Sequence, residues 1–561
     1  MTLQPGTVSP VDALAGRFWQ GVLETSPTLA TFYGDDRYAG QLEDTTARGR
    51  SVVRDLMVRT AAEAAAISTD GLVAEERITR DILQVVARLQ IEQDDLHLHV
   101  LRAVDHLNGP QQLLPWLTQF QPADTPERFE AFVERLHAYP AYIAGHIQDL
   151  ADGLESGLTA PRVVAERTIA QIERVLAIPS DDALVATMVQ VASEADRERV
   201  REVVRDVVRP ADVAFLDALK GDYLAATRDD AGLWSAPNGD TLYRTAIRSW
   251  TSLDVDPGDV HAIGMTQLAS IEAERRGIAR AAGFGEDTAA YRAALDADAR
   301  NTPATRDALI ARANEDIERA MALAPTYFGV LPRASCEVRA VESYKEKDAP
   351  IAYYYPPSPD GSRDGIYYAN GYDLPSRTFS KLAAITYHEA VPGHHFQISL
   401  ETENSRLSAF RRFGARDIGS AYVEGWGLYS ERLADEMGLY RNEAERFGML
   451  DGQAVRAGRL VVDTGLHALR WPRQRSIDFM RMAGLSEADA VIETDRYICW
   501  PGQALTYMIG QLEIQRLRAE LTARDGSRFD LRSFHDALLG HGSLPLATLA
   551  RELPNWVATP V

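Results

Sequence analysis

Apolar residues recur at every third or fourth position along most of the chain, with polar residues between them. This spacing puts the apolar side chains on one face of an α-helix, and the same stretches are rich in the helix formers Ala, Leu, Glu and Arg. The pattern predicts a mainly α protein. Before residue 336 the predicted helices are Val11–Thr25, Thr46–Ile67, Val73–Gln93, Glu127–Glu155, Val163–Val175, Glu194–Thr227, two helices within Leu242–Gly283 that meet near Asp256-Pro257, and Arg306–Leu323.

After residue 395 the helical pattern returns. It predicts helices at Gly419–Met437, Glu443–His467, Gln474–Ala483, Ser486–Ile498, Gly502–Ala523 and Leu531–Leu539. We interpret residues 1–335 as an N-terminal helical half and residues 336–561 as a second half, merged into one unit.

Strand signals are confined to residues 338–370. Ala352–Tyr355 and Gly365–Ala369 are aromatic and favour strands, and the intervening Pro356–Arg363 is a run of turn formers. The pattern predicts a β-hairpin. It is either a structural flap or an edge strand that pairs with an extended peptide, in which case Tyr367 and Tyr368 contact substrate.

Composition narrows the possible partners. The chain of 561 residues has a net charge of −22. Such a charge argues against nucleic acid and anionic membranes, because binding phosphates requires a basic surface. Only two cysteines are present, which indicates no disulfide framework. We see neither a secretion signal within Met1–Gly16 nor an apolar run of about 20 residues, and therefore expect a cytoplasmic protein without membrane spans.

The segment Tyr387–His395 reads Tyr-His-Glu-Ala-Val-Pro-Gly-His-His. It begins like the H-E-x-x-H motif of zinc hydrolases, in which two histidines one turn apart bind the metal and the glutamate acts on water. Here the i+4 position is Pro392, and the next imidazoles are at i+6 and i+7. In an unbroken helix the i+7 residue lies about 10 Å along the axis, too far for a shared ion.

Pro392 lacks the N–H that would bond to the carbonyl of His388, and its ring clashes with that carbonyl. Gly393 permits unusual backbone angles. Without these two residues the sequence is His-Glu-Ala-Val-His, an intact motif. We therefore interpret the segment as H-E-x-x-H with a two-residue bulge. His388 and His394 are the predicted ligands, and His395 is the alternative second ligand.

A catalytic zinc site needs a third protein ligand. The best candidate is Glu424, which lies among apolar and small residues, where an unpaired carboxylate would be costly. The alternative for Glu424 is a structural ion pair. Glu431, two turns on, could orient a ligand. We expect Gly425 and Gly427 to allow close backbone packing.

Two further segments carry candidate chemistry. Arg459, Asp463 and His467 recur every four residues on one face of an apolar helix. They are either a structural ion pair with a capped histidine, or Arg459 binds a substrate carboxylate and His467 donates to an oxyanion. Tyr507 follows the Pro501-Gly502 step and is either a core residue or an oxyanion donor.

Tyr387–Gln397 resembles the H-E-A-x-P-G-H-H signature of the bacterial domain-of-unknown-function family 885. The resemblance extends over nearly the whole chain. The other matching segments are Val423–Tyr429, Arg456–His467, Pro501–Gly510, Phe534–Gly540 and, more weakly, Leu242–Gly264.

More distantly, the predicted arrangement of helices, hairpin and histidine motif resembles helical zinc peptidases of the gluzincin type, such as thimet oligopeptidase, angiotensin-converting enzyme and carboxypeptidase Taq. The resemblance implies two helical halves around a deep channel, with a short hairpin next to the zinc helix. It also implies His388, His394 and Glu424 as zinc ligands and Glu389 as general base. The chain departs from these enzymes at Pro392-Gly393.

Together these features predict a Zn²⁺-dependent hydrolase, a metallopeptidase acting on short peptides. Alternatives are a zinc hydrolase of non-peptide amides or esters, and a non-catalytic helical metal-binding protein. The predicted catalytic residues are Glu389, Tyr507 and His467, and the predicted substrate contacts are Arg459, Tyr367, Tyr368 and His395.

Overall fold

The computed structural model describes residues 9–177, 193–341, 346, 350–358, 361 and 363–557. Over these residues the protein is mainly α, as predicted. The chain forms two compact units, and the predicted division at residue 335 is not where they part, because the chain from Ala246 onwards packs with the C-terminal elements. The first unit comprises Met1–Thr245, Leu466–Arg473 and Ile492–Pro501, and the second comprises Ala246–Gly465, Gln474–Val491 and Gly502–Val561.

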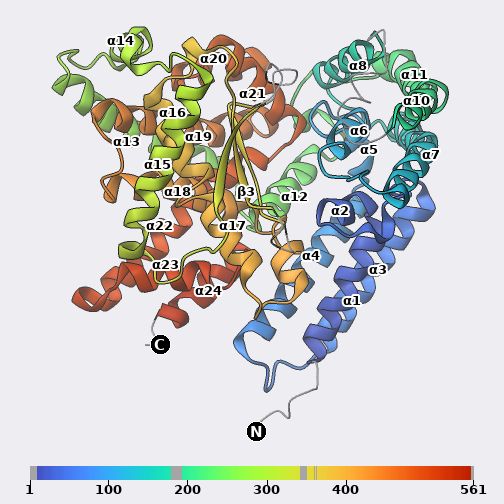
Figure 1. The fold of residues 1–561 in the computed structure, drawn as a ribbon, viewed down its shortest axis with the longest axis horizontal. Helices are drawn as coiled ribbons and strands as arrows, with labels where there is room; N and C mark the ends of the chain where they lie inside the picture. The colour runs from blue at the N-terminus through green and yellow to red at the C-terminus, as the bar shows by residue number, and fades with distance from the viewer. Residues whose placement is uncertain are drawn as a thin grey trace. The chain divides into compact units, whose positions relative to one another are not determined.

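In the first unit α1, α3 and α4 pack side by side (Figure 1). Their contacts follow the predicted spacing: Val11, Leu14 and Phe18 of α1 and Ile78 and Ile82 of α4 are buried. The helices are α1 (Pro10–Thr25), α2 (Pro27–Phe32), α3 (Ala47–Ala66), α4 (Ala74–Asp95), α5 (His99–Arg102), α6 (Leu113–Leu117), α7 (Pro126–Ser156), α8 (Arg162–Leu176), α10 (Glu194–Val203) and α11 (Arg209–Ala218).

The remaining helices belong wholly or partly to the second unit. The predicted start at Asp256-Pro257 is confirmed, since the Asp256 carboxylate accepts a hydrogen bond from the N–H of Gly258 at 2.8 Å. The helices are α12 (Gly239–Thr251), α13 (Pro257–Ala281), α14 (Thr288–Ala297), α15 (Arg306–Tyr327), α16 (Phe379–Glu389), α17 (His394–Glu403), α18 (Ser420–Glu436), α19 (Glu443–His467), α20 (Arg473–Ala483), α21 (Glu487–Cys499), α22 (Thr506–Asp525), α23 (Leu531–Leu539) and α24 (Leu546–Val557).

A small sheet lies in the second unit in the order β1-β3-β2. The strands are β1 (Cys336–Ala340), β2 (Ala352–Tyr355) and β3 (Gly365–Ala369). The predicted hairpin pairing is confirmed, because β2 runs antiparallel to β3. Part of the predicted turn, residues 359, 360 and 362, lies outside the described residues.

The strand β1 adds to β3 in parallel, so β3 is the central strand and all five of its residues are buried. The predicted substrate contact of Tyr367 is therefore wrong, because its side chain has no exposed surface, whereas that of Tyr368 stays a prediction. Tyr367 is fully buried with its hydroxyl 3.4 Å from that of Thr386. Tyr368 packs between Tyr353 and Tyr355.

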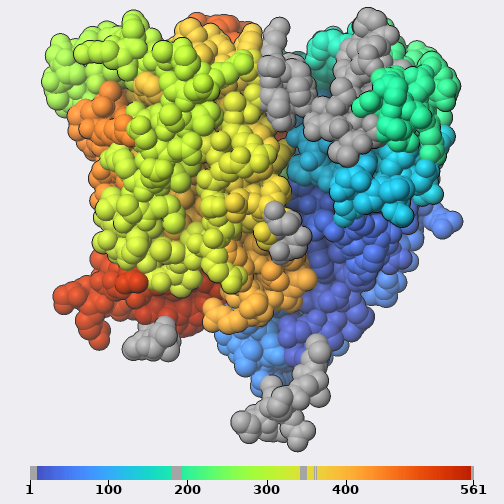
Figure 2. Space-filling view, viewed as in Figure 1, coloured from blue at the N-terminus to red at the C-terminus, as the bar shows by residue number. Residues whose placement is uncertain are grey.

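The helix α15 packs against α16, the helix that carries the first histidine of the motif. Lime-coloured residues, α15 among them, form much of the face of the second unit that Figure 2 shows. On α16, Leu382, Ala383 and Ala384 are buried. The start of the motif thus lies on a helix held within the unit.

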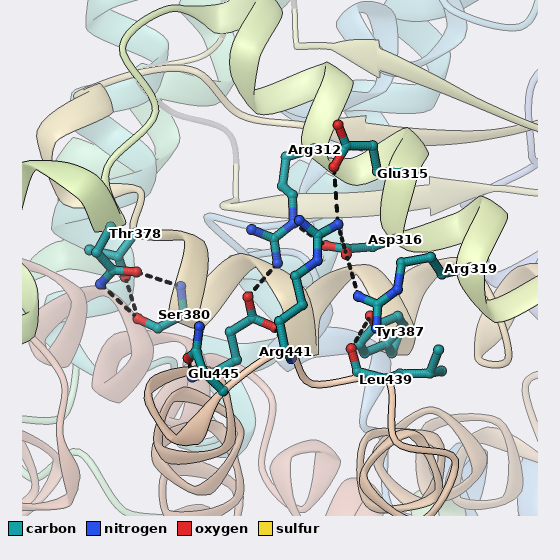
Figure 3. A network of polar contacts seen from close by, with 12 residues as sticks. Arg312, Glu315, Asp316, Arg319, Thr378, Ser380, Tyr387, Leu439, Arg441 and Glu445 are labelled. Atoms are coloured by element: carbon teal, nitrogen blue, oxygen red, sulfur yellow. Dashed lines mark hydrogen bonds and ion pairs between the residues drawn. The ribbon is translucent and has the colours of Figure 1, made fainter. Parts of the chain in front are cut away.

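A buried ion network fixes α15 to the segments around α16 (Figure 3). Asp316 of α15 is fully buried and lies 2.9 Å from the Arg312 guanidinium and 3.1 Å from that of Arg441. Arg312 also reaches Glu445 of α19 at 2.5 Å. Tyr387 joins the same region by donating its hydroxyl proton to the Leu439 carbonyl at 3.1 Å. The residue next to His388 is thereby tied to the loop between α18 and α19.

Candidate metal centre

The histidine motif spans two helices. The first, α16, ends at Glu389, and α17 begins at His394. Ala390 (φ −106°, ψ −103°) and Gly393 (φ −79°, ψ −128°) both leave helical geometry. The predicted distortion at Pro392-Gly393 is confirmed, but it is larger than the expected two-residue bulge, because the four residues 390–393 separate two helices. Pro392 ends the first helix, as its missing N–H and bulky ring require.

The break between the helices is stabilised by close packing and by α18. A Cβ on Gly393 would lie 1.9 Å from the carbonyl oxygen of His388, so only glycine fits. The indole N–H of Trp426 donates to the Pro392 carbonyl at 2.9 Å, and the Ser430 hydroxyl donates to the same oxygen at 3.4 Å. Side chains of α18 thus bond a carbonyl that the interrupted helix leaves without a helical partner.

The helix break brings His388 and His394 together beside Glu424 of α18. The Glu424 carboxylate oxygen lies 3.6 Å from Nε2 of His388 and 3.5 Å from Nε2 of His394. The three potential ligand atoms all lie within 4.8 Å of one another. A tetrahedral zinc site with bonds of about 2.0–2.1 Å separates its ligand atoms by about 3.3 Å. The donor set and its spacing therefore fit Zn²⁺.

Behind the cluster, Glu431 binds the other side of the His388 ring. Its carboxylate lies 2.9 Å from Nδ1 of His388, and both side chains are almost fully buried. The second Glu431 oxygen accepts a hydrogen bond from the Gln453 amide at 3.2 Å. With Glu431 accepting at Nδ1, Nε2 of His388 faces Glu424. The arrangement is the carboxylate–histidine pairing that orients metal ligands.

The charges around His388 favour its protonated form when no ion is bound. Burial alone would lower the pKa of His388, but hydrogen bonds to Glu424 and Glu431, with the charge of Glu389, raise it to about 9. Burial likewise opposes ionisation of Glu424, yet the two imidazoles hold the pKa of Glu424 well below its usual range. A cation is therefore favourable between these groups, and a proton competes with a metal for the site.

Two glycines allow this close approach, as predicted. A Cβ on Gly427 would lie 2.9 Å from ring atoms of both His388 and His394. On the other side of α18, a Cβ on Gly425 would lie 2.4 Å from the Cα of Gly510 in α22. The two histidines and α22 thus press against α18 at backbone distance.

The contact between α18 and α22 brings Tyr507 to the cluster. Its ring is stacked near that of His388, with centroids 6.3 Å apart, and the Arg459 guanidinium lies 4.5 Å from the centre of the Tyr507 ring. Both Tyr507 and Arg459 are buried. The structure thus brings two of the predicted residues into the surroundings of the metal cluster.

His395 does not belong to the cluster. Nδ1 of its ring is 3.0 Å from the Tyr354 hydroxyl on β2, and Nε2 is 3.1 Å from the Ala334 carbonyl. Burial lowers the pKa of His395 to about 4. Both ring nitrogens are occupied, so His395 is neither the alternative metal ligand nor a substrate contact. Its contacts instead link α17 to β2.

His467 is also occupied on both sides. Its Nδ1 accepts a hydrogen bond from the Leu233 N–H at 3.1 Å, and its Nε2 lies 2.9 Å from the Tyr497 carbonyl. Burial lowers the pKa of His467 to about 4. This ring has no nitrogen left for a substrate, so the predicted oxyanion role is wrong. His467 is a core residue of the first unit.

Glu389 is the last residue of α16 and is only half-buried. Its charge contributes to the raised pKa of His388 and, after burial, to the raised pKa of Tyr367. The carboxylate therefore acts electrostatically on the cluster from the helix end where the break begins.

Sequence reasoning missed two residues that support the cluster. Trp426 caps the helix break, and Gln453 fixes the second oxygen of Glu431. Trp426 lies two residues after Glu424 and between two glycines. A large side chain flanked by glycines was the feature of the sequence that could have indicated its role. Nothing local to Gln453 indicated its partner, which lies 22 residues away.

These features define a mainly helical protein with a buried His-His-Glu cluster built across a helix break. The chain belongs to the family described as "Bacterial protein of unknown function (DUF885)", whose model matches residues 27–553. None of the curated proteins matches this chain.

Two solved structures resemble this protein over nearly its whole length. One is a "putative lipoprotein" from Colwellia psychrerythraea, 28% identical, with a TM-score of 0.91, covering 98% of this chain and 100% of that one. The other is a "putative lipoprotein of unknown function" from Shewanella oneidensis, 19% identical, with a TM-score of 0.76, covering 97% and 99%. The second likeness concerns the fold alone. In the described part of the present chain, every helix is too short or too polar to span a bilayer.

Proposed function

We propose that this protein is a zinc-dependent hydrolase, a metallopeptidase that cleaves short peptides. The observation that carries the proposal is the His388–His394–Glu424 cluster, whose ligand atoms converge within 4.8 Å across a helix break. Glu431 orients one ligand from behind, as in catalytic metal centres. Three protein ligands leave a fourth position open, which is typical of catalytic rather than structural zinc.

Bound zinc would supply Lewis acidity, lowering the pKa of water and polarising a substrate carbonyl. The remaining steps belong to the side chains. Glu389, half-buried directly after His388, accepts the proton of the attacking water and passes it to the leaving nitrogen. Tyr507 is the proposed donor to the developing oxyanion. The guanidinium of Arg459, 4.5 Å from the ring centre of Tyr507, places a positive charge beside this donor.

The sheet supports a peptide as the substrate. The order β1-β3-β2 leaves β2 at an edge, and its Tyr354 is bound to His395, the neighbour of the ligand His394. An extended chain that adds to such an edge forms main-chain hydrogen bonds. The tie to α17 would set that chain at a fixed distance from the metal cluster. The acidic net charge of −22 disfavours nucleic acid as an alternative partner.

The test is Glu389→Gln, measured for both zinc content and peptide hydrolysis. Purification avoids metal-affinity resin, and zinc is counted by plasma mass spectrometry. We expect about one zinc to be retained at the cluster, while turnover of a short-peptide library falls about 10²–10⁴-fold. Glu403→Gln, which removes a half-buried carboxylate of α17 that pairs with Arg333, is the matched control. Unchanged turnover in Glu389→Gln, with activity in the wild type, would refute the mechanism.

A further inference from the structure

A second group of histidine and carboxylate side chains lies in the first unit. His99 of α5 and Asp149 and Asp152 of α7 each offer a ligand atom, and these atoms all lie within 4.8 Å of one another. His146, one turn before Asp149 on α7, adds a ring nitrogen 3.5 Å from the Asp149 carboxylate. Neither the sequence motif nor the proposed hydrolase chemistry involves these residues.

Several ring nitrogens of this group are buried without a hydrogen-bond partner. They are Nδ1 of His99 and both nitrogens of His146. A buried polar group left without a partner is costly, so such groups are normally satisfied. Nε2 of His99 faces Asp149 at 3.9 Å, and Nδ1 of His146 lies 3.5 Å from the same carboxylate, both beyond ordinary hydrogen-bond geometry. An ion between these groups would satisfy them.

Arg50 of α3 organises the carboxylates. Its guanidinium lies 2.7 Å from one oxygen of Asp149 and 3.7 Å from Asp152. The Asp149 oxygen that faces His146 is the other one. Arg50 also donates to the Thr45 carbonyl at 2.8 Å, which anchors it to the start of α3. Nε2 of His99 lies 3.9 Å from the Asp149 oxygen that Arg50 holds. Arg50 thus fixes the orientation of Asp149 between the two histidines, as partners outside a metal site do for its ligands.

We infer that His99, Asp149 and Asp152 form a second metal site, with His146 beside it, which takes a first-row divalent cation such as Zn²⁺. The mixture of imidazole nitrogen and carboxylate oxygen suits such ions, whereas Mg²⁺ and Ca²⁺ prefer oxygen alone. The two carboxylates carry charge −2 and Arg50 carries +1, so the group without an ion has net charge −1. Asp152 is 37% exposed and gives the ion a route from solvent.

This ion would have a structural role. It would join the short α5, four residues long, to the long α7. The inference is independent of the proposed hydrolase, because it requires no activity at the other cluster.

The experiment counts zinc ions in each unit separately. Chelator-stripped protein is titrated with ZnCl₂ by calorimetry and checked by equilibrium dialysis with plasma mass spectrometry. We expect two zinc ions for the wild type and one for the His388→Gln/His394→Gln double variant. In that background, Asp152→Asn and His99→Gln should each weaken the remaining site at least tenfold. Asp124→Asn, which removes a half-exposed carboxylate just before α7 paired with Arg128, should not.

Two outcomes would overturn the inference. One is a double variant that binds no zinc at concentrations that saturate the wild-type centre. The other is a remaining ion whose affinity is unchanged by both Asp152→Asn and His99→Gln, because that ion must lie elsewhere. Circular dichroism melts show whether each variant is folded. Asp152→Asn changes a partly exposed residue by one atom, so its folding should be unaffected.

Discussion

Glu431 provides the sharpest test of the metal centre, because it touches the ligand His388 and not the ion. Its carboxylate lies 2.9 Å from Nδ1 of His388, and its side chain is 1% exposed. Glu431→Gln preserves the shape but removes the charge. In the wild type the Gln453 amide donates to the second Glu431 oxygen at 3.2 Å. In the variant an amide nitrogen would take the place of that oxygen. Two donors would then face each other.

The expected loss of zinc affinity follows from these contacts. A buried hydrogen bond to a charged group contributes about 1.5–3 kcal/mol, and a neutral one about half as much. Loss of an outer partner of a metal-binding histidine typically weakens metal binding about 10–100-fold. Glu431→Gln retains one neutral acceptor, so we expect zinc affinity to fall about 10–30-fold, whereas Glu431→Ala should approach 100-fold.

The assay is competition for zinc with a chromophoric chelator of known affinity. Glu436→Gln is the matched control, because it removes a carboxylate of the same helix that pairs with Arg518 near the surface. We expect the control to bind zinc as the wild type does. Equal zinc affinity for Glu431→Gln and Glu436→Gln in folded protein would refute the view that Glu431 orients His388.

Two further predictions concern packing and pH. In Gly427→Ala the new Cβ would press on both imidazoles at 2.9 Å, so zinc affinity should fall more than tenfold in a chelator competition, although Ala favours the helix by about 1 kcal/mol. Burial raises the pKa of Asp212 to about 6, against the hydrogen bond from Tyr139. A carboxyl with a higher pKa in the folded state stabilises the fold below its unfolded pKa, and this stabilisation is lost as the pH rises through 6. Between pH 4 and pH 7 the free energy of unfolding of the first unit should therefore fall by about 2 kcal/mol more in the wild type than in Asp212→Asn, measured by urea denaturation.

Each of these predictions has a clear contrary result. Wild-type zinc affinity in Gly427→Ala would mean that the imidazoles are not confined by α18. A pH profile of unfolding that is the same for Asp212→Asn and the wild type would mean that this carboxyl ionises in the folded unit as readily as in the unfolded chain.

Much of the helical framework was predictable, because amphipathic spacing is a local property. The bounds of α19 and α23 match the prediction residue for residue. The helix α24 was not predicted; it contains Pro554, which lies in its last turn. The parallel addition of β1 could not be foreseen, since it pairs residues 29 positions apart. The partners that enclose the tyrosines of β3 are also distant in the chain: Thr386 contacts Tyr367, and Tyr353 stacks on Tyr368.

The site was predictable to the extent that its chemistry is local. Glu424 stood out as a carboxylate among apolar residues, and the structure brings it to the two histidines. The predicted roles of His395 and His467 are wrong for the same reason. Each imidazole binds backbone groups distant in the chain, Ala334 for the first and Leu233 for the second. Sequence spacing carries no information about such partners.

The helix break has a consequence for when the protein can acquire metal. In a standard H-E-x-x-H helix, a single turn already presents both imidazoles, so a nascent helix can chelate an ion early in folding. Here His388 and His394 belong to different helices, and the carbonyl between them is bonded by Trp426 of the helix that also carries Glu424. The chelate exists only after three helices have assembled. Metal uptake should therefore follow folding of the second unit, and an excised Tyr387–His395 peptide should be a poor zinc binder.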